Sequence, residues 1–533
     1  MNLTKRTSYK VILAAAAVLA AALLAYSNSF QGAFQFDDYN QINENPYIRD
    51  LANVPRFFYD ASIGSDWTQF AGLTGYRPIT YSSFAFNYAL GAYAPAGYHV
   101  FNFSVHFLNS LLVFFMVDAI LRASGREKRF ALSLLSALVF AVHPVQTGAV
   151  TYISGRAALL ASFFYLLAFL CFLSFRRSGG SPAGKAAGAA APLLYLLALF
   201  SKEMAVSLPA AMLAFDLLFT APARGGLRKS WRMLLYYLPF AGLLVLYVFT
   251  KKALQGFVAG PVLAMGTPEY LMSEAKVLLM YARLLLLPFN QNADYNLPAA
   301  MAPDLHFFIA AAVICAAFWY FYRLRSRLPE AAFFGAWFFI ALAPESSLVP
   351  IPDIAVEYRV YLASAGFITA GLVLAPGLMK GGRFMRAATA AVVLFLALAA
   401  FNRNFVWQTS VGFWEDAKAK APWSDRARAN LGKALLDEGR HDEAAREFEA
   451  FLSGDHGPDA VFIVLNNLGI SYSKMGRKED AVIAFNKAIE IFPDNPEPYL
   501  NLSDVYRSMG RPADAEEALR AFARAKASGR GGF

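Results

Sequence analysis

Long apolar runs alternate with short polar segments along the first 404 residues of the chain. A helix that crosses a membrane needs about 20 apolar residues, or fewer where flanking side chains reach the interface. The pattern therefore predicts an all-α fold with a polytopic membrane bundle of about 11 transmembrane helices. The predicted spans are centred on residues 11–26, 98–121, 130–145, 157–175, 192–200, 206–219, 234–249, 305–322, 331–343, 361–378 and 387–401.

The first run is predicted to be an uncleaved signal anchor. Lys5, Arg6 and Lys10 precede it, and no small-x-small cleavage site is followed by a soluble domain. The basic flank places the N-terminus in the cytoplasm.

Basic loop residues all fall on the cytoplasmic side of the predicted bundle, provided that residues 271–288 do not cross it. That segment carries Glu274, Lys276 and Arg283, each of which costs about 2.5–3.5 kcal/mol in mid-membrane. We therefore expect an interfacial or re-entrant helix on the outer side, which leaves the C-terminus outside. The basic groups are Arg122/Arg126/Lys128/Arg129, Arg176/Arg177/Lys185, Arg224/Arg228/Lys229/Arg232, Arg323/Arg325/Arg327 and Lys380/Arg383/Arg386.

Two segments between spans differ in character. Residues 27–97 are polar and aromatic, and we expect a large first loop on the outer, periplasmic side, beside the bilayer. Residues 179–191 are rich in Gly and Ala and predict a cytoplasmic linker.

A helical repeat follows the last span. Asn430-Leu-Gly, Asn467-Leu-Gly and Asn501-Leu-Ser recur in phase, each followed by a Gly, an Ala and then a Phe or Leu at fixed offsets. This is the tetratricopeptide (TPR) pattern, in which small residues let paired helices touch and Gly ends the first helix. The pattern predicts a C-terminal α-solenoid that binds a peptide or protein partner.

These patterns divide the chain into four parts. Residues 1–404 are the predicted transmembrane domain and residues 405–425 a linker or cap that contains Trp407, Trp414 and Trp423. Residues 426–527 are the predicted repeats, and residues 528–533 a flexible tail.

Composition narrows the class of protein. Of 533 residues, 57% are apolar and 16% charged, with a mean hydropathy of +0.40, which excludes a wholly soluble or disordered chain. The net charge of +10 divides into −3 from residue 405 onward (17 Lys+Arg, 20 Asp+Glu) and +13 before it. The basicity therefore belongs to the membrane loops, and no nucleic-acid partner is expected. Cys171 and Cys315 lie in apolar runs, which excludes a disulfide framework.

The most prominent candidate catalytic residues lie in the first loop. Asp37 and Asp38 are adjacent carboxylates directly outside the first span. Such a pair can raise one pKa towards that of a useful base, bind a divalent cation such as Mg²⁺ or Mn²⁺, or only cap a turn. Two ligands are too few to assert a metal.

Further ionisable residues fall at the predicted outer ends of spans. Polar groups at that depth usually face an internal cavity. The alternatives are an internal ion pair or an interfacial anchor, with side-chain packing for His99 and a helix end for His143. The candidates are Arg77, His99, His143, Arg156, Lys202, Glu203, Glu345, Glu357 and Arg359.

An ordered set of short motifs runs through the membrane part of the chain. The motifs are Phe36-Asp37-Asp38, Asn45-Pro46, Tyr76-Arg77-Pro78, Asn87-Tyr88, Gly97-Tyr98-His99 with His106, Val142-His143-Pro144-Val145 leading to Gly155-Arg156, Ser201-Lys202-Glu203, residues 284–288 and Glu357-Tyr358-Arg359 with Tyr361. This ordered set resembles the transmembrane and TPR-containing (TMTC) family, and is similar to that family's shorter bacterial relatives. The chain departs from the eukaryotic pattern at two acidic positions, where it has Gly148 and Ala158.

The resemblance implies an O-mannosyltransferase of the GT-C class in a bacterial inner membrane. It implies a polyprenyl-phosphate sugar donor and an acceptor hydroxyl on a protein, lipid or glycan, joined on the periplasmic side. Asp37 or Asp38 would then act as base, and Arg359 with Arg77, Arg156 or Lys202 would hold the departing phosphate. We expect a single displacement with inversion. A non-enzymatic TPR scaffold and, third, a transporter are the alternatives.

Overall fold

The computed structural model describes residues 3–60, 76–126, 129–178, 180–220, 231–255, 265–346, 350–351, 353–375 and 382–527. Within these ranges the chain is helical and contains no strand. It divides into two compact units, residues 1–291 with 297–408 and residues 292–296 with 409–533. The predicted tail at 528–533 and the loop residue Asp66 lie outside the described ranges, as do the basic residues Lys128, Arg224, Arg228, Lys229 and Lys380.

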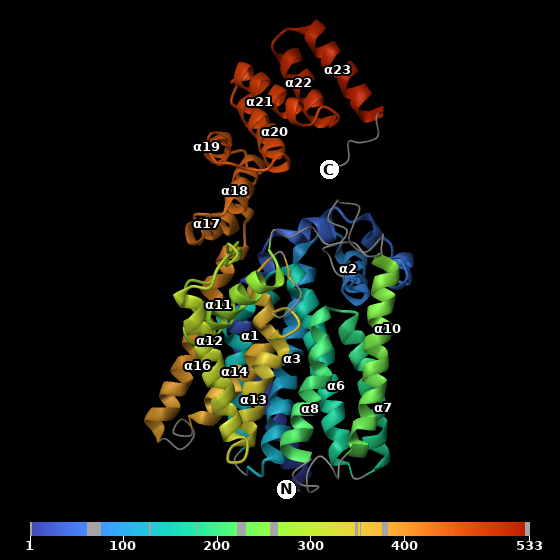
Figure 1. Ribbon diagram of the computed structural model, residues 1–533, viewed down its shortest axis with the longest axis vertical. Coiled ribbons are helices and arrows are strands. Elements are labelled where there is room, and N and C mark those ends of the chain that lie inside the picture. The colour runs from blue at the N-terminus through green and yellow to red at the C-terminus, as the bar shows by residue number, and fades with distance from the viewer. Residues whose placement is uncertain are drawn as a thin grey trace. The chain divides into compact units, whose positions relative to one another are not determined.

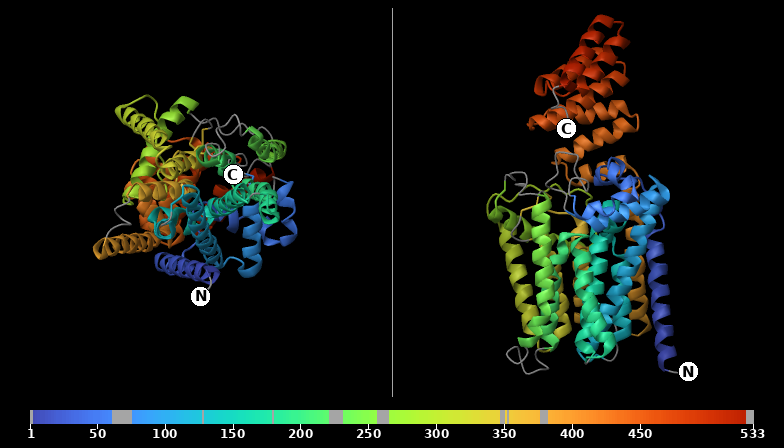
Figure 2. Two further views of the ribbon diagram at one scale, coloured as in Figure 1. Left: turned by 90° about the horizontal axis from the view of Figure 1, so that it is seen from below. Right: turned by 90° about the vertical axis from the view of Figure 1, so that its right-hand side faces the viewer.

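The first unit is a bundle of long helices that run side by side (Figures 1 and 2). The described residues of every predicted span overlap one of these helices, and α11 is a single continuous helix over most of the segment expected to be interfacial or re-entrant. The helices are α1 (Leu3–Tyr26), α3 (Pro95–Ala123), α4 (Arg129–Val142), α6 (Arg156–Arg177), α7 (Pro182–Leu199), α8 (Leu208–Phe215), α10 (Leu238–Gln255), α11 (Thr267–Leu286), α12 (Leu305–Leu324), α13 (Pro329–Leu342), α14 (Val360–Leu374) and α16 (Arg383–Asn404).

Fewer helices than the predicted eleven have a membrane-spanning length. In the described part of the chain, eight are long and apolar enough to cross, or nine if α4 and the helical residues after it, bent by 52°, form one span. The remaining two predicted spans, α13 and α14, have 14 and 15 residues. Both pack inside the bundle against each other, which explains why they are apolar without being long.

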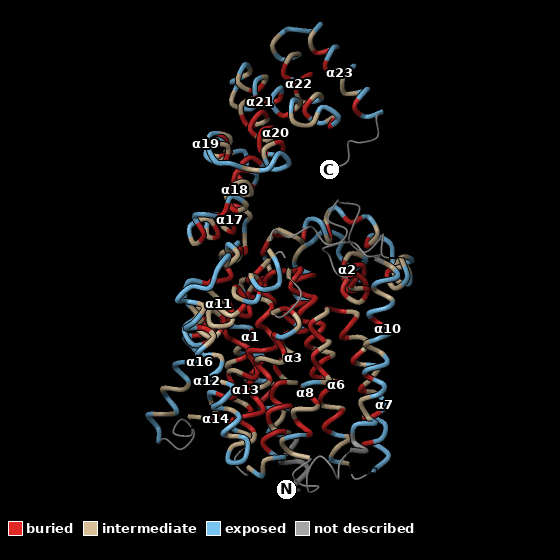
Figure 3. Tube along the Cα trace, viewed as in Figure 1, coloured by how far each residue is buried: buried red, intermediate tan, exposed pale blue. Residues whose placement is uncertain are grey.

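Burial distinguishes central from peripheral helices (Figure 3). In α3 and α6 more than half of the apolar window is buried, whereas in α12 only 6% is. A helix that is apolar on all sides and still exposed requires an apolar solvent around it. The outer faces of α10, α12 and α16 therefore suit contact with lipid.

The expected linker at 179–191 is largely helical, because α7 already begins at Pro182. Two glycines explain its close packing on α6: a Cβ at Gly184 would overlap the Ser178 side chain, and one at Gly188 would lie 2.7 Å from the Phe175 ring. Small residues let helix backbones approach in this way.

The described parts of the first loop, residues 27–60 and 76–97, are packed together. They contain short 3₁₀ and π turns and the helix α2 (Pro78–Gly91). Their core joins the loop to the ends of α3 and α6, and consists of Phe34, Ile42, Ile48, Phe57, Tyr81, Phe84, Ala85, Tyr98 and Ile153.

The second unit is a stack of helix pairs. The first helix of each of the three predicted repeats ends at Gly439, Gly476 or Gly510, and all three have positive φ, the left-handed conformation that glycine adopts without strain. A further helix precedes the pairs within residues 405–425. The helices are α17 (Ser410–Lys420), α18 (Asp425–Asp437), α19 (His441–Leu452), α20 (Pro458–Lys474), α21 (Lys478–Ile491), α22 (Glu497–Ser508) and α23 (Pro512–Ala527).

A glycine and a phenylalanine interlock in each of the first two repeats. A Cβ added at Gly432 would lie 2.5 Å from the ring of Phe448, and one added at Gly469 would lie 2.6 Å from the ring of Phe485. Both rings are buried. The repeat spacing therefore places a glycine of the first helix against a buried phenylalanine ring of the second helix, where a larger residue would not fit.

This interlock predicts that Gly469→Val destabilises the second unit by about 1–3 kcal/mol, the usual cost of overpacking. Gly457→Val is the control, because a Cβ there meets no atom within 4 Å and the backbone is extended. We expect a lower unfolding temperature and faster trypsin cleavage within residues 409–527 of the detergent-solubilised full chain for Gly469→Val only. Equal effects of the two variants would contradict the interlock.

Candidate functional site

The Asp37–Asp38 pair begins a short helical turn outside α1. The residue before it, Phe36, has φ +48°, which is uncommon for a residue with a side chain and costs energy unless the surroundings hold it. The turn is closed by the Asp38 N–H, which donates to the Gln35 carbonyl at 2.9 Å. The backbone reverses here, and the two neighbouring carboxylates leave it in different directions.

Asp38 is buried, with 1% of its surface exposed, and its carboxylate accepts three hydrogen bonds. The donors are the Gln35 N–H at 2.9 Å, the Ser154 N–H at 2.7 Å and the Ser154 hydroxyl at 2.5 Å. Burial raises the pKa of Asp38 to about 7, although these hydrogen bonds oppose the rise. Asp38 thus fastens the loop to the turn η8 (Ile153–Gly155) that leads into α6.

Asp37 points towards Tyr152 instead. The Tyr152 hydroxyl donates to Asp37 Oδ2 at 2.8 Å and accepts from the Asp37 N–H at 3.2 Å. Asp37 is one wall of a small cavity of about 20 Å³, hereafter the Asp37 cavity. The residues that line it are Asp37, Gln41, Arg77, Tyr152, Ser154, Gly155, Ala157, Ala158, Lys202 and Tyr358.

Arg77 reaches the Asp37 cavity from the residue before α2. Its Nη2 lies 3.1 Å from Glu203 Oε2, and Lys251 Nζ lies 2.8 Å from the other oxygen of Glu203. Burial by itself lowers the pKa of Arg77, but Glu203, Tyr81, Tyr358 and Glu345 together outweigh it, and the pKa ends above its ordinary range. Arg77 is therefore a permanent cation.

Lys202 supplies the second cation of the cavity and is 2% exposed. Its Nζ lies 2.7 Å from Glu345 Oε1 and 4.5 Å from the centre of the Tyr358 ring, a cation–π contact. Burial lowers the pKa of Lys202, and the Glu345 carboxylate opposes that shift. The structure thus brings Asp37, Arg77 and Lys202 together from three distant parts of the sequence.

Three other predicted site residues hold the fold and do not line the Asp37 cavity. His99 Nε2 lies 3.0 Å from the Gly32 carbonyl oxygen, and His143 Nε2 lies 3.2 Å from that of Leu285. Arg156 is fully buried. It donates to Asn102, Ser83 and Tyr98, and its guanidinium lies over the rings of Phe84 and Phe101.

Glu357 and Arg359 are also placed beside the cavity and not in it. Glu357 accepts a hydrogen bond of 2.9 Å from Gln291. Arg359 donates to the Ile354 carbonyl at 2.9 Å and lies 3.9 Å from Glu274. Between them, Tyr358 reaches the cavity, so this motif contributes its middle residue.

The two aspartates do not fit a divalent cation. Asp38 accepts three hydrogen bonds from protein donors, and Asp37 points away from it. The described residues also include no group of three or more His, Cys, Asp or Glu side chains that could hold a metal.

Sequence reasoning missed Tyr152 and Gln41. Neither stands out as a charge in an apolar run, and Tyr152 lies between two quoted motifs. One departure from the eukaryotic pattern is at the cavity, since Ala158 lines it. The other is at a close contact, because a Cβ at Gly148 would lie 3.1 Å from Glu357 Cβ.

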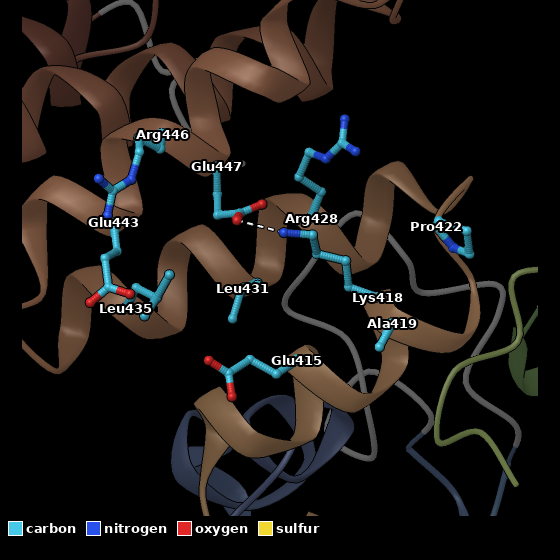
Figure 4. Close-up of a pocket in the computed structure, with 10 residues that line it drawn as sticks. All are labelled: Glu415, Lys418, Ala419, Pro422, Arg428, Leu431, Leu435, Glu443, Arg446 and Glu447. Carbon is cyan, nitrogen blue, oxygen red and sulfur yellow. Dashed lines mark hydrogen bonds and ion pairs between the residues drawn. The ribbon is translucent and has the colours of Figure 1, made fainter. Parts of the chain in front are cut away.

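The second unit has a groove of its own, shown in Figure 4. Its walls come from α17, α18 and α19, and the ion pair between Lys418 and Glu447 at 2.6 Å crosses it. Leu431 and Leu435 lie between charged side chains. The remaining lining residues are Glu415, Ala419, Pro422, Arg428, Glu443 and Arg446.

Comparison with known proteins finds family models that match the repeats and related proteins that match most of the chain. Tetratricopeptide repeat models match residues 421–494 and 484–517. The protein O-mannosyl-transferase Tmtc3 of Drosophila melanogaster is 24% identical, covering 94% of this chain and 57% of that protein. The protein O-mannosyl-transferase TMTC4 of Mus musculus is 25% identical, covering 80% and 64%.

A third relative, the protein O-mannosyl-transferase F38B6.6 of Caenorhabditis elegans, is 24% identical over 81% of this chain and 61% of its own length. The chain thus spans about three fifths of the length of the curated relatives it matches. A solved structure, the APC/C hetero-tetramer Cut9–Hcn1, aligns over 84% of this chain and 86% of that chain at 15% identity. Its TM-score of 0.22 is too low to describe a shared fold.

The buried Asp38 predicts a pH-dependent stability. Its pKa is about 7 in the fold and 3.8 ordinarily, so the folded chain keeps a proton that the unfolded chain releases. Stability therefore falls as pH rises between these values, by at most about 1.4 kcal/mol per pH unit. We expect the unfolding temperature of the wild type to fall from pH 5 to pH 7 more steeply than that of Asp38→Asn.

Asp50→Asn is the control for this pH series. Asp50 lies in the same loop but is exposed, and it accepts only from the Ala52 N–H. Its variant should keep the wild-type slope. Parallel slopes for the wild type and Asp38→Asn would show that Asp38 does not hold the proton.

Proposed function

We propose that this homologue of the TMTC-family protein O-mannosyltransferases is itself a membrane glycosyltransferase, of the GT-C class. The proposed reaction moves a sugar, such as mannose or another hexose, from a polyprenyl-phosphate donor to an acceptor hydroxyl. One observation carries the proposal: the Asp37 cavity is lined by a carboxylate, Asp37, and by two cations, the half-buried Arg77 and the buried Lys202. The names of the relatives agree with this reaction class.

Asp37 is the proposed general base. It takes the proton of the acceptor hydroxyl while the acceptor oxygen forms a bond to the anomeric carbon of the sugar. The bond from that carbon to the phosphate oxygen breaks, and the polyprenyl phosphate leaves with the electron pair. Among the described residues that line the cavity, Asp37 is the only acid, which favours a single displacement with inversion over a covalent intermediate.

Arg77 and Lys202 are the proposed phosphate ligands. Charge-assisted hydrogen bonds from such groups are roughly twice as strong as neutral ones. Each cation already has a carboxylate partner, so an entering phosphate shares it with Glu203 or Glu345. Both cations are held in place before the donor arrives, which reduces the cost of ordering them.

An apolar cavity in the same unit suits the lipid part of the donor. It has a volume of about 290 Å³, and all of its lining residues are apolar side chains or glycines of α11, α12, α13 and α14. Phe367 on α14 is the lining residue nearest in sequence to Tyr358 of the Asp37 cavity, about 13 Å away at the rise of a helix. A donor with a charged head and an apolar tail matches two such cavities.

The proposed location is a bacterial inner membrane, crossed several times, with the N-terminus cytoplasmic and the first loop and repeats periplasmic. Loop charges support this orientation. Basic residues lie at one end of α3, α4 and α6, where Arg122 and Arg129 pair with Asp118. The Asp37 cavity lies where α6 begins, at the opposite end of that helix.

The repeats are proposed to bind the acceptor or a partner protein. Their groove offers apolar side chains between charges of both signs, which suits a peptide segment and not a nucleic acid. The relatives are named as protein O-mannosyl-transferases, so a protein acceptor is preferred here over a lipid or glycan.

Replacement of the proposed base gives the first functional test. Asp37→Asn should lower sugar transfer from polyprenyl-phosphate hexoses by about 10²-fold or more, the usual contribution of a general base. Transfer is measured in membranes at matched expression, with Asp50→Asn as the control in the same loop. If Asp37→Asn transfers sugar at the wild-type rate, Asp37 is not the base.

If no donor supports transfer even by the wild type, the non-enzymatic scaffold replaces this proposal. That reading makes a different prediction for the same variants. If the protein is a scaffold, substitutions of Leu431 or Leu435 in the groove should weaken the binding of a partner protein, whereas Asp37→Asn should leave that binding unchanged.

Replacement of the buried Lys202 should lower kcat/KM for the sugar donor more than kcat/KM for the acceptor. Removal of one charge-assisted hydrogen bond costs about 1.5–3 kcal/mol, so Lys202→Met should lower kcat/KM for the donor by about 10-fold to 100-fold. The Glu345→Gln/Lys202→Met double variant is the matched control, since it leaves no unpaired carboxylate. A double variant with wild-type kinetics would exclude Lys202 as a phosphate ligand.

A further inference from the structure

Tyr152 holds the proposed base through two hydrogen bonds. Its hydroxyl donates to Asp37 Oδ2 at 2.8 Å and at the same time accepts from the Asp37 backbone N–H at 3.2 Å. One phenolic oxygen thus fixes both the main chain and the carboxylate of the same residue. The neighbouring Phe36 has positive φ, a backbone conformation that costs energy for a residue with a side chain. Contacts from outside the turn are therefore needed to hold this conformation and, with it, the position of Asp37.

The Tyr152 ring is in turn held between two other aromatic rings. It stacks on Trp407 with ring centres 5.4 Å apart and an interplanar angle of 25°, and on Tyr358 at 6.4 Å and 29°. Tyr152 is 5% exposed. A ring packed in this way has little freedom to rotate, and its hydroxyl therefore has a fixed position.

Trp407 belongs to the segment that ends α16, and that segment also holds the loop. The Trp407 carbonyl accepts from Gln35 Nε2 at 3.3 Å, and the Gln408 carbonyl accepts from the Ala33 N–H at 3.2 Å. The loop and the Tyr152 ring are thus attached to the same short stretch of backbone. Asp37 and its support cannot move apart without breaking several contacts.

The Tyr152 phenol stays protonated at neutral pH and therefore acts as a hydrogen-bond donor to Asp37. Burial, with Asp37 and Asp38 adding to it, raises the pKa of Tyr152 well above its ordinary range. A neutral hydroxyl that donates to a carboxylate stabilises the charged form of that carboxylate. Tyr152 therefore favours the form of Asp37 that can accept a proton.

We propose that Tyr152 is a positioning residue for sugar transfer: it orients the Asp37 carboxylate into the cavity and keeps it ionised. This inference rests on the proposed function. Tyr152 does not itself exchange a proton with the substrate. Other ionisable groups around Asp37 act on it as well, namely Asp38 on the same loop, Arg77, Lys202 and Tyr358 across the cavity, and Glu203 and Glu345 behind the two cations.

The test compares Tyr152→Phe with Tyr93→Phe in the full-length protein in membranes. Both variants remove one tyrosine hydroxyl that is bonded to the first loop, but Tyr93 donates to the exposed Asn43 carbonyl and not to Asp37. We expect Tyr152→Phe to lower kcat by about ten-fold with KM values for donor and acceptor nearly unchanged. The acidic limb of its pH profile should move up by about one unit. Tyr93→Phe should match the wild type.

A purely structural role for Tyr152 would lower the amount of active protein without moving the pH profile, and that result would overturn the proposal. The Asp37→Asn/Tyr152→Phe double variant adds a second criterion. A residue that acts through Asp37 causes no further loss once the carboxylate is gone, whereas an independent loss of the full ten-fold contradicts the proposal.

Failure of this inference is distinguishable from failure of the proposed function. If Asp37→Asn abolishes transfer while Tyr152→Phe keeps the wild-type kcat and pH profile, only the role of Tyr152 is wrong. If Asp37→Asn itself has no effect, the base is wrong and the role of Tyr152 falls with it.

Discussion

The position of the first loop depends on one buried carboxylate, Asp38, whose hydrogen bonds all come from protein donors in the structure. Asp38 is out of reach of water, and a carboxylate in that position is costly unless hydrogen bonds surround it. The donors come from its own turn and from Ser154, more than a hundred residues later. The first loop must therefore return to the start of α6. That return determines the position of Asp37, because the neighbouring residue is already fixed.

The fold was largely predictable because its signals are local. Apolar length alone locates the helices of the bundle, and in-phase small residues locate the repeats. Two features were less predictable, for one physical reason. Ala and Gly at 182–191 are equally typical of a linker and of a closely packed helix, and α13 and α14, with 14 and 15 residues, are apolar and buried but short for a span. The side chains around a segment decide such cases, and one sequence does not reveal them.

The candidate site was predictable only in part, because a polar residue in an apolar run has two equally good explanations. Arg77 and Lys202 do reach the cavity with Asp37. Arg156 has the same appearance in the sequence, but it donates to Asn102 and Ser83, 54 and 73 residues away, and so satisfies buried carbonyl and amide oxygens of the fold. Tyr152 gave no signal, since a tyrosine among apolar residues is typical of a core.

The charges around the Asp37 cavity explain how its two cations would stabilise the transition state of sugar transfer more than the bound donor. Each cation is paired with a carboxylate, so neither is an isolated buried charge, which would be strongly destabilising. A sugar linked through a phosphodiester carries one negative charge, whereas the released phosphate monoester carries up to two, its second pKa being near 6. The cations therefore gain most from the charge that develops as the bond to the sugar breaks. Under the proposed function, the glutamates weaken the hold on the intact donor, and the cations stabilise the transition state more than the ground state, which is the condition for catalysis.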